Sequence, residues 1–139
     1  MDGDIAPLDE IVKLCKKYNC ISMIDEAHAT GVLGKNGSGA SEMFNIQRDI
    51  DICMGTLSKA VGSVGGYVAG SRKLIDFLKN RARAFIFDTS LPASALAASI
   101  KSIKLIQNSD GPRKRLLSNI KNLYSFLKIN KFNFIYNET

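Results

Sequence analysis

The chain has 139 residues, of which 45% are hydrophobic and 23% charged, a composition typical of a globular protein with one core. No run approaches the roughly eighteen consecutive apolar residues of a membrane-spanning helix. The acidic start Met-Asp-Gly-Asp differs from the basic start of a signal peptide, so we expect no membrane association and a cytoplasmic protein.

The net charge of +6 raises the question of nucleic-acid binding. Ten of the nineteen lysines and arginines lie between Lys79 and Lys128, within helical patterns whose opposite face is apolar. This pattern is typical of a solvated helix surface. Because no basic face is interleaved with aromatic residues and no recognition-helix motif is present, we expect no nucleic-acid partner.

In chain order, the first half alternates helix and strand. Residues 7–18 have the apolar spacing of an amphipathic helix, and 20–25 form a short β-branched run typical of a strand. The glycine-rich residues 29–39 indicate a loop, followed by a helical turn at 40–44. A second apolar run at 51–55 predicts a second strand.

The middle of the chain begins with a predicted strand at 65–70. It follows the strand at 51–55 too closely for a helical crossover, so it should be antiparallel or lie at an edge. Ser71 is expected to cap a helix that continues to about Arg83. The three apolar residues at 85–87 are interpreted as a short strand.

Pro92 begins a long predicted helix, and residues 93–100 within it are small or apolar, which favours burial in a core or at a subunit contact. After a break at 110–112, a final helix is predicted from about 112 to 128, with a weak strand at 132–136. The residues expected to face inward from this last helix are Leu116, Leu117, Ile120, Leu123, Tyr124 and Leu127.

The three cysteines lack metal-ligand spacing. Cys15 lies on the apolar side of the first predicted helix, and Cys20 and Cys53 lie in predicted strands. We therefore expect buried free thiols and no metal site.

Two groups of polar residues follow the first two predicted strands. Asp25 and His28 come after the strand at 20–25, and Thr56, Ser58 and Lys59 come after the strand at 51–55. Ligands gather at the carboxyl ends of parallel strands, so these residues are expected at one rim. A lysine for a Schiff base, a carboxylate for a pyridine nitrogen and hydroxyls for a phosphate suit pyridoxal 5'-phosphate (PLP).

These motifs carry a specific resemblance. The segments 25–31, 34–39, 55–60 and 65–70, supported by 2–8 and 85–92, resemble the α-oxoamine synthases, which are PLP-dependent enzymes of the aminotransferase class I/II type. The resemblance covers about residues 1–105 in the same order. It implies an α/β fold, namely the central slice of the large domain of a fold-type I PLP-dependent transferase, with a mainly parallel sheet and flanking helices.

The resemblance also implies a domain division and a shortened chain. Residues 1–108 would be part of the PLP-binding large domain, and 109–139 a linking helix and the start of a truncated C-terminal small domain. Members of the family are much longer. Met1 can therefore be an internal methionine of a longer gene, the start of a truncated reading frame, or the edge of a cut piece.

By resemblance, each residue of the rim takes a role. Lys59 would carry PLP through a Schiff base, and Asp25 would pair with the protonated pyridine nitrogen, so that the ring withdraws electrons from the substrate. His28 would hydrogen-bond the phenolic oxygen of PLP and help to handle the acyl donor. Thr56 and Ser58 would lie near the phosphate. Glu26, beside Asp25, is expected to be structural.

The segment Asp88–Ser90 is expected to face the partner subunit of a homodimer. Relatives carry serine or threonine at the place of Asp88, and this pair of positions contacts the phosphate of the neighbouring subunit's PLP. An aspartate there repels a phosphate dianion. Either Asp88 turns away and Thr89 makes the contact alone, or the chain binds PLP poorly.

The reaction implied is the decarboxylating condensation of an amino acid with an acyl-CoA or acyl-carrier-protein thioester. Residues 65–70 and 80–87 look most like the 8-amino-7-oxononanoate synthases of biotin biosynthesis, which use L-alanine. Glycine C-acetyltransferase or another α-oxoamine synthase remains an alternative, as does an inactive truncated fragment. A helicase-type nucleotidase is disfavoured, because Asp25–His28 has no accompanying phosphate-binding loop, and no dinucleotide-binding glycine motif opens a helix.

Overall fold

The computed structural model describes residues 3–137 and 139, and it has three strands and six α-helices within them. The helices are α1 Leu8–Lys17, α2 Ala40–Met43, α3 Arg72–Arg81, α4 Arg83–Ile86, α5 Ala93–Asn108 and α6 Gly111–Ile129. The strands are β1 Met23–Asp25, β2 Ile52–Thr56 and β3 Gly66–Gly70, and a 3₁₀ turn spans Gln47–Asp49.

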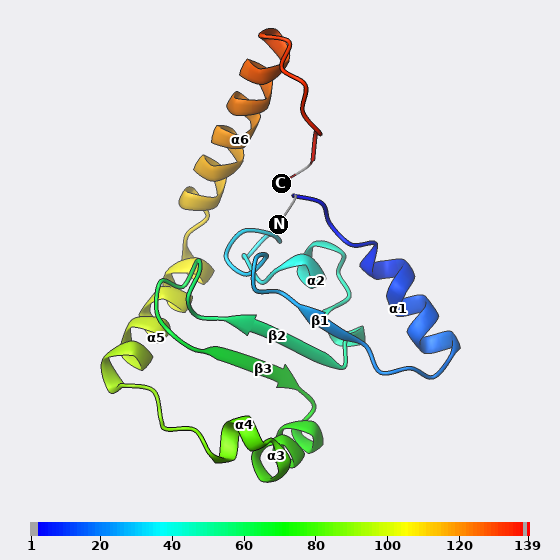
Figure 1. Cartoon of the computed structure of the whole chain (residues 1–139), viewed down its shortest axis with the longest axis vertical. Helices are drawn as coiled ribbons and strands as arrows, with labels where there is room; N and C mark the ends of the chain where they lie inside the picture. Colours follow the sequence, from blue (N-terminus) through cyan, green and yellow to red (C-terminus); the bar gives the residue numbers. More distant parts are fainter. Residues whose placement is uncertain (1–2, 138) are drawn as a thin grey trace.

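The three strands form one mixed sheet in the order β1-β2-β3. β1 and β2 are parallel, with Asp25 opposite Met54, and β2 and β3 are antiparallel, with Gly55 opposite Tyr67. The two strands that precede the polar motifs are therefore neighbours with the same direction, and their carboxyl ends lie on the same side of the sheet (Figure 1). The predicted antiparallel strand at 65–70 is confirmed.

Ser22 and Asp51 fix the beginning of this parallel pair. The Ser22 backbone N–H and hydroxyl both donate to Asp51 Oδ2 at 2.8 Å, and the Asp51 N–H donates to Ser22 Oγ at 2.9 Å. Hydrogen bonds from Ser22, first from its backbone and then from its side chain, lower the pKa of the Asp51 carboxyl. The register that places the two motifs together is thus set at the opposite end of the strands.

Helix ends follow the local sequence. In α1 the acidic Asp9 and Glu10 occupy the first turn and Lys16 and Lys17 the last, which complements the helix dipole. Ser71 caps α3 by accepting the backbone N–H of Leu74 at 3.2 Å. Both predicted helices are confirmed.

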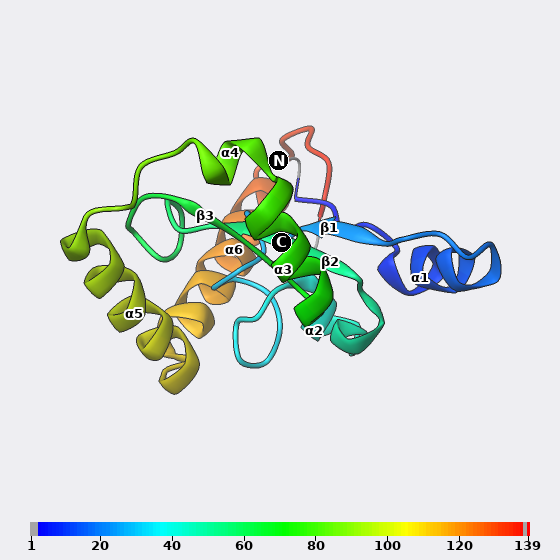
Figure 2. The ribbon, with the colours of Figure 1, turned by 90° about the horizontal axis from the view of Figure 1, so that it is seen from below.

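The small core lies around the sheet and the loop after β1. Its buried apolar residues are Val12, Ile24, Ala27, Ala40, Ile46, Leu57 and Val61. In Figures 1 and 2, α1 lies beyond β1 and α3 and α4 lie beyond β3. Helix α5 lies beside the loops at one end of the sheet, and in Figure 1 α6 extends away from it. No helix in the described part of the chain is both long and apolar enough to cross a membrane.

Arg113 joins the C-terminal helix to the glycine-rich loop. Its buried guanidinium donates to the carbonyls of Ile106 at 2.7 Å, Ser109 at 3.1 Å and Lys35 at 3.1 Å. The other nine lysines and arginines between Lys79 and Lys128 are exposed, as the helical pattern predicted.

Two strand predictions are wrong. Residues 83–86 form α4 where a strand was expected at 85–87, because the N–H groups of Phe85 and Ile86 donate to the Ala82 carbonyl at 2.9 and 3.0 Å. Residues 132–136 also form no strand.

Three burial predictions also fail. Cys20 is an exposed free thiol, whereas Cys15 and Cys53 are half-buried and free. In α5 only Ser99 is buried, and Leu96 and Ile100 are exposed. Among the residues expected to face inward from α6, the exposed ones are Leu116, Leu117 and Leu123. The physical reason is common to both helices: few described residues pack against them (Figure 1).

Candidate active site

Asp25 ends β1 with an exposed side chain. Its Oδ1 accepts the backbone N–H of Ala27 at 2.8 Å, so the carboxylate also stabilises the turn that follows the strand. One oxygen is thus used for local structure at the rim, and the side chain remains open to a ligand from the solvent side.

Glu26 is the structural anchor of this rim. Only 1% of its surface is exposed, and its carboxylate oxygens accept the N–H groups of Ala40 and Ser41, each at 2.8 Å. Its own N–H donates to the Met54 carbonyl at 2.8 Å, which extends the pairing of β1 with β2. A single residue therefore connects β1, β2 and the start of α2.

His28 is exposed and lies in the turn between β1 and the glycine-rich loop. This turn is held at its base, because the N–H groups of Ala29 and Thr30 both donate to the Glu26 carbonyl, at 3.0 and 2.8 Å. The imidazole consequently projects from a fixed backbone.

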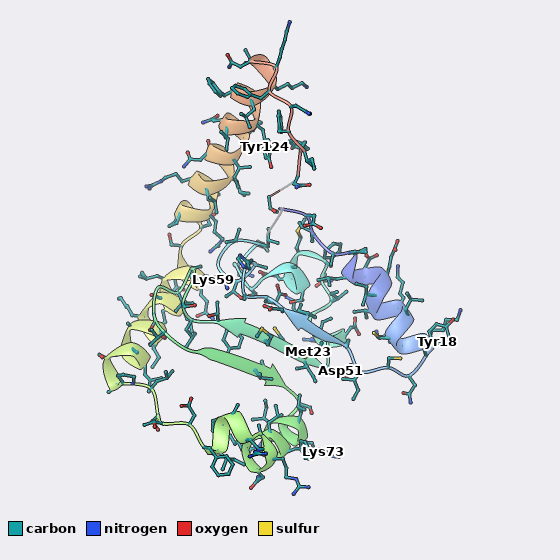
Figure 3. The ribbon with its side chains drawn as sticks, in the orientation of Figure 1. Tyr18, Met23, Asp51, Lys59, Lys73 and Tyr124 are labelled. Atoms are coloured by element: carbon teal, nitrogen blue, oxygen red, sulfur yellow. The ribbon has the colours of Figure 1, made fainter. Side chains whose placement is uncertain are left out.

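Lys59 lies in a tight loop beyond the end of β2, opposite the end marked by Asp51 (Figure 3). The loop is closed by backbone bonds from Gly62 N–H to the Lys59 carbonyl at 2.9 Å and from Ser63 N–H to the Leu57 carbonyl at 2.7 Å. Buried Leu57 and Val61 anchor it on both sides. The Lys59 side chain itself is exposed.

The hydroxyls of Thr56 and Ser58 contact each other at 2.8 Å. Thr56 Oγ1 also donates to the Gly65 carbonyl at 3.2 Å and accepts the Ser58 N–H at 3.2 Å. Because the single Thr56 proton is directed to Gly65, Ser58 is the donor in the pair. The two hydroxyls lie at the base of the Lys59 loop.

The two motifs meet at Gly31 and Ala60. A Cβ at Gly31 would lie 2.5 Å from the Ala60 Cβ, so the turn that follows His28 abuts the residue that follows Lys59. Gly31 has a φ of +81°, which also favours glycine. The structure therefore brings Asp25, His28 and Lys59 to one end of the sheet, as the strand pattern predicted.

Thr89 is not brought to this rim. The segment Asp88–Ser90 lies between α4 and α5 on the outside of the molecule (Figure 1), and its residues are exposed. The Asp88 Oδ1 accepts the N–H of Thr89 at 2.8 Å. The carboxylate therefore has a local partner in its own segment.

A hollow of about 800 Å³ lies on the other side of β1, against α1. Asp25 and His28 line part of it together with apolar residues such as Leu8 and Ile11, but Lys59 does not. No group of His, Cys, Asp and Glu side chains suited to a metal ion occurs in residues 3–137 or at 139.

Glu26 is structural, as the sequence predicted, but its partners in α2 were not indicated. Two further contacts were also not indicated: the Thr30–Tyr67 hydroxyl contact at 3.1 Å and the bond from the Ser63 hydroxyl to the Ala95 carbonyl at 2.9 Å. Each joins residues distant in the chain, so no local spacing indicates it. The nearest signal was the cluster of glycines, which marks places where other groups approach closely.

Comparison with known proteins defines the class. The model of the aminotransferase class I and II family matches residues 1–139, and the chain belongs to this family, whose cofactor is PLP. The donor set fits that group, because an exposed lysine amine, a carboxylate and two hydroxyls stand at one rim.

Within the family, the relatives are α-oxoamine synthases. The chain is 53% identical over 128 residues to the 8-amino-7-oxononanoate synthase of Thermoanaerobacter pseudethanolicus, covering 92% of this chain and 32% of that protein. The crystal structure of the Francisella tularensis 8-amino-7-oxononanoate synthase matches with a TM-score of 0.84 and 32% identity, covering 100% of this chain and 41% of that one.

A serine palmitoyltransferase from S. paucimobilis, described with a bound PLP–myriocin aldimine, matches with a TM-score of 0.88 and 39% identity. The match covers 93% of this chain and 33% of that chain. The fold expectation is confirmed: the chain has the α/β fold of the PLP-dependent transferases. It spans about a third of the length of the curated relatives.

Proposed function

We propose that this chain is the central part of an α-oxoamine synthase that condenses L-alanine with an acyl thioester and releases carbon dioxide, as the 8-amino-7-oxononanoate synthases of biotin biosynthesis do. The observation that supports it most is the parallel pairing of β1 and β2, which brings Asp25, His28 and Lys59 to one rim. The identity of about 50% to enzymes of that name supports the reaction class.

The residues have separable tasks. PLP, when bound, supplies a ring that withdraws electrons from the amino-acid α-carbon. Lys59 attaches the cofactor, and Asp25 keeps the pyridine nitrogen protonated through its negative charge. His28 donates a hydrogen bond to the ring oxygen and borders the space for the acyl donor. Thr56 and Ser58 lie near the phosphate at the base of the Lys59 loop, and a hydroxyl that donates to it has to turn from its present acceptor.

The Asp88–Ser90 segment serves the partner subunit in this proposal. Asp88 already accepts the Thr89 N–H, which supports the alternative in which the aspartate turns aside and Thr89 alone contacts the partner's phosphate. The site is then completed in a cytoplasmic homodimer. Residues 1–108 belong to the cofactor domain, and 109–139 link it to the small domain.

Two alternatives remain: another α-oxoamine synthase with the same cofactor chemistry, and a fragment without activity. Glycine C-acetyltransferase differs in the amino acid and the acyl group, and the residues of the rim do not discriminate between these substrates. An inactive fragment is the other alternative, supported by the span of about a third of the relatives' length.

The test is a substrate comparison on the complete polypeptide, loaded with PLP. Thiol release is measured with L-alanine, glycine and L-serine, each paired with pimeloyl-CoA, acetyl-CoA and palmitoyl-CoA. Preference for L-alanine with pimeloyl-CoA is expected. Preference for glycine with acetyl-CoA supports the alternative enzyme, and no release with any pair contradicts the proposal.

A further inference from the structure

Tyr67 crosses the sheet from its outer strand. It lies on β3 opposite Gly55 of β2, and a Cβ at Gly55 would lie 2.5 Å from the Tyr67 Cζ. The phenol ring therefore lies over the Gly55 position, which only a residue without a side chain leaves open. Gly55 is buried within the extended strand β2. Glycine is therefore needed here to make room for the Tyr67 ring and not to form a turn.

The Tyr67 hydroxyl reaches the turn that carries His28. Its oxygen lies 3.1 Å from Thr30 Oγ1, and Thr30 Oγ1 donates to the Glu26 carbonyl at 3.0 Å. Because the one Thr30 hydroxyl proton is used in that bond, Tyr67 is the donor and Thr30 the acceptor. A chain of hydrogen bonds thus runs from β3 over β2 to the end of β1.

The next residue places this connection beside the lysine loop. Gly31, which follows Thr30, abuts Ala60, which follows Lys59. The Gly31 N–H donates to the Gly37 carbonyl at 2.8 Å, so the turn is held on its far side as well. A shift of Thr30 therefore changes the spacing between the turn of His28 and the loop of Lys59.

We propose that Tyr67 is a positioning residue that acts through Thr30 to hold the His28 turn at a fixed place relative to Lys59. The absence of a side chain at Gly55 leaves the room that the Tyr67 ring needs to reach Thr30. This inference rests on the proposed function for its catalytic consequence. Its geometric part rests only on the contacts among β2, β3 and the turn.

The experiment compares Tyr67→Phe, Thr30→Val, the double variant and Thr30→Ser in the complete polypeptide. In the cofactor-free protein, hydrogen exchange of the peptide spanning residues 26–33 is expected to be about 2- to 10-fold faster in Tyr67→Phe, the range for one lost hydrogen bond. It should be at least as fast in Thr30→Val, which also removes the bond to the Glu26 carbonyl. The double variant should match Thr30→Val, and Thr30→Ser should keep the wild-type rate because it keeps the hydroxyl.

In the PLP-loaded protein, kcat is expected to fall on the order of tenfold in Tyr67→Phe, since small misplacement of a reacting group is costly. The KM for the amino acid should change by less than about twofold, because the residues that bind the cofactor remain. Tyr18→Phe is the matched control, since Tyr18 is an exposed tyrosine directly after α1, and it should leave both measurements unchanged.

The inference is overturned if the peptide 26–33 exchanges at the wild-type rate in both single variants. It is also overturned if the effects of the two substitutions add in the double variant, or if Thr30→Ser exchanges faster than the wild type. Failure of the proposed function has a different signature. Borohydride would then attach no PLP to Lys59 in the wild-type protein, while the exchange rates still decide whether Tyr67 holds the turn.

Discussion

At the scale of single residues, Asp25 and Lys59 are carried by neighbouring strands yet have different surroundings. Asp25 already accepts one backbone N–H, whereas Lys59 extends from a loop closed by its own backbone carbonyl. The carboxylate can therefore be changed without opening the lysine loop. This separation makes the two proposed roles distinguishable by substitution.

In the complete polypeptide, Lys59→Ala is expected to abolish borohydride-reducible PLP attachment, because it removes the amine that forms the imine. Asp25→Asn should leave attachment intact but lower turnover by roughly 10²-fold or more, since it removes the charge opposite the pyridine nitrogen. Peptide mapping after reduction locates the label. Lys73→Ala, at the exposed start of α3 (Figure 3), is the control; a label on any lysine but Lys59 contradicts the assignment.

The half-buried thiol of Cys53 reports on the charge of the same rim. Burial raises its pKa above the ordinary thiol value, and the negative charges of Glu26 and Asp25 raise it further. Less thiolate is therefore present at pH 8, and iodoacetamide should alkylate Cys53 more slowly than the exposed Cys20.

Mass spectrometry of the alkylated peptides over pH 7 to pH 10 measures this difference. Asp25→Asn should shift the Cys53 profile to lower pH, because it removes one of the charges that disfavour the thiolate. A Cys53 alkylation profile that stays at the same pH, or that shifts to higher pH, would show that the Asp25 carboxylate does not act on this thiol.

At the scale of elements, the glycine-rich loop is tied down by two acidic residues. Glu26 binds the start of α2, and Glu42 within α2 accepts the N–H groups of Asn36 and Ser38 at 3.0–3.1 Å. Burial raises the pKa of Glu42, but hydrogen bonds from Ser38 and Asn36 outweigh it, so the net pKa is lowered. The loop that follows His28 thus has a defined conformation.

Gly39→Ala should destabilise this loop more than Gly62→Ala does. Both positions have positive φ, +116° and +68°. A side chain at Gly62 introduces backbone strain of roughly 1–2 kcal/mol, whereas Gly39, with a ψ of −169°, has a conformation essentially restricted to glycine, where the strain is about 1–3 kcal/mol. At Gly39 the new Cβ would also lie 2.5 Å from Glu26 Oε2, whereas at Gly62 it meets nothing within 4 Å. Urea unfolding of the complete polypeptide should therefore show a free energy of unfolding lower by about 2 kcal/mol or more in the Gly39 variant than in the Gly62 variant. Equal losses would mean that Glu26 can move aside.

Elements with a strong local signal were predicted from the sequence, and those fixed by distant contacts were not. The Ser71 cap, the apolar face of α1 and the two strands before Asp25 and Thr56 carry their own patterns. The run at 85–87 does not, because three apolar residues satisfy a strand or a helical turn equally. Of the site, the residue types and their common rim were predictable; the Tyr67–Thr30 contact was not.

At the scale of the whole molecule, apolar side chains are exposed on three separate parts. Phe85 and Phe87 lie between α3 and α5, Leu96 and Ile100 lie on α5, and Ile129 lies at the end of α6. β1 leaves one edge unpaired in the described sheet. Exposed apolar surface and open strand edges both promote association between molecules.

The 139-residue chain by itself is therefore expected to associate and to be a poor catalyst. The net charge of +6 opposes association at low salt, and because salt screens this repulsion, association should increase between about 0.01 M and 0.5 M ionic strength. Sedimentation velocity measures the size distribution, and thermal unfolding followed by circular dichroism is expected to be broad.

We expect no catalysis because Asp88–Ser90 is proposed to serve a partner subunit and the chain spans only about a third of its relatives' length. The decisive comparison is between this chain and the complete polypeptide at the same concentration, with PLP and both substrates present. A monodisperse 139-residue species with a cooperative transition and steady thiol release would contradict the expectation, and it would mean that the rim formed by β1 and β2 suffices for the reaction.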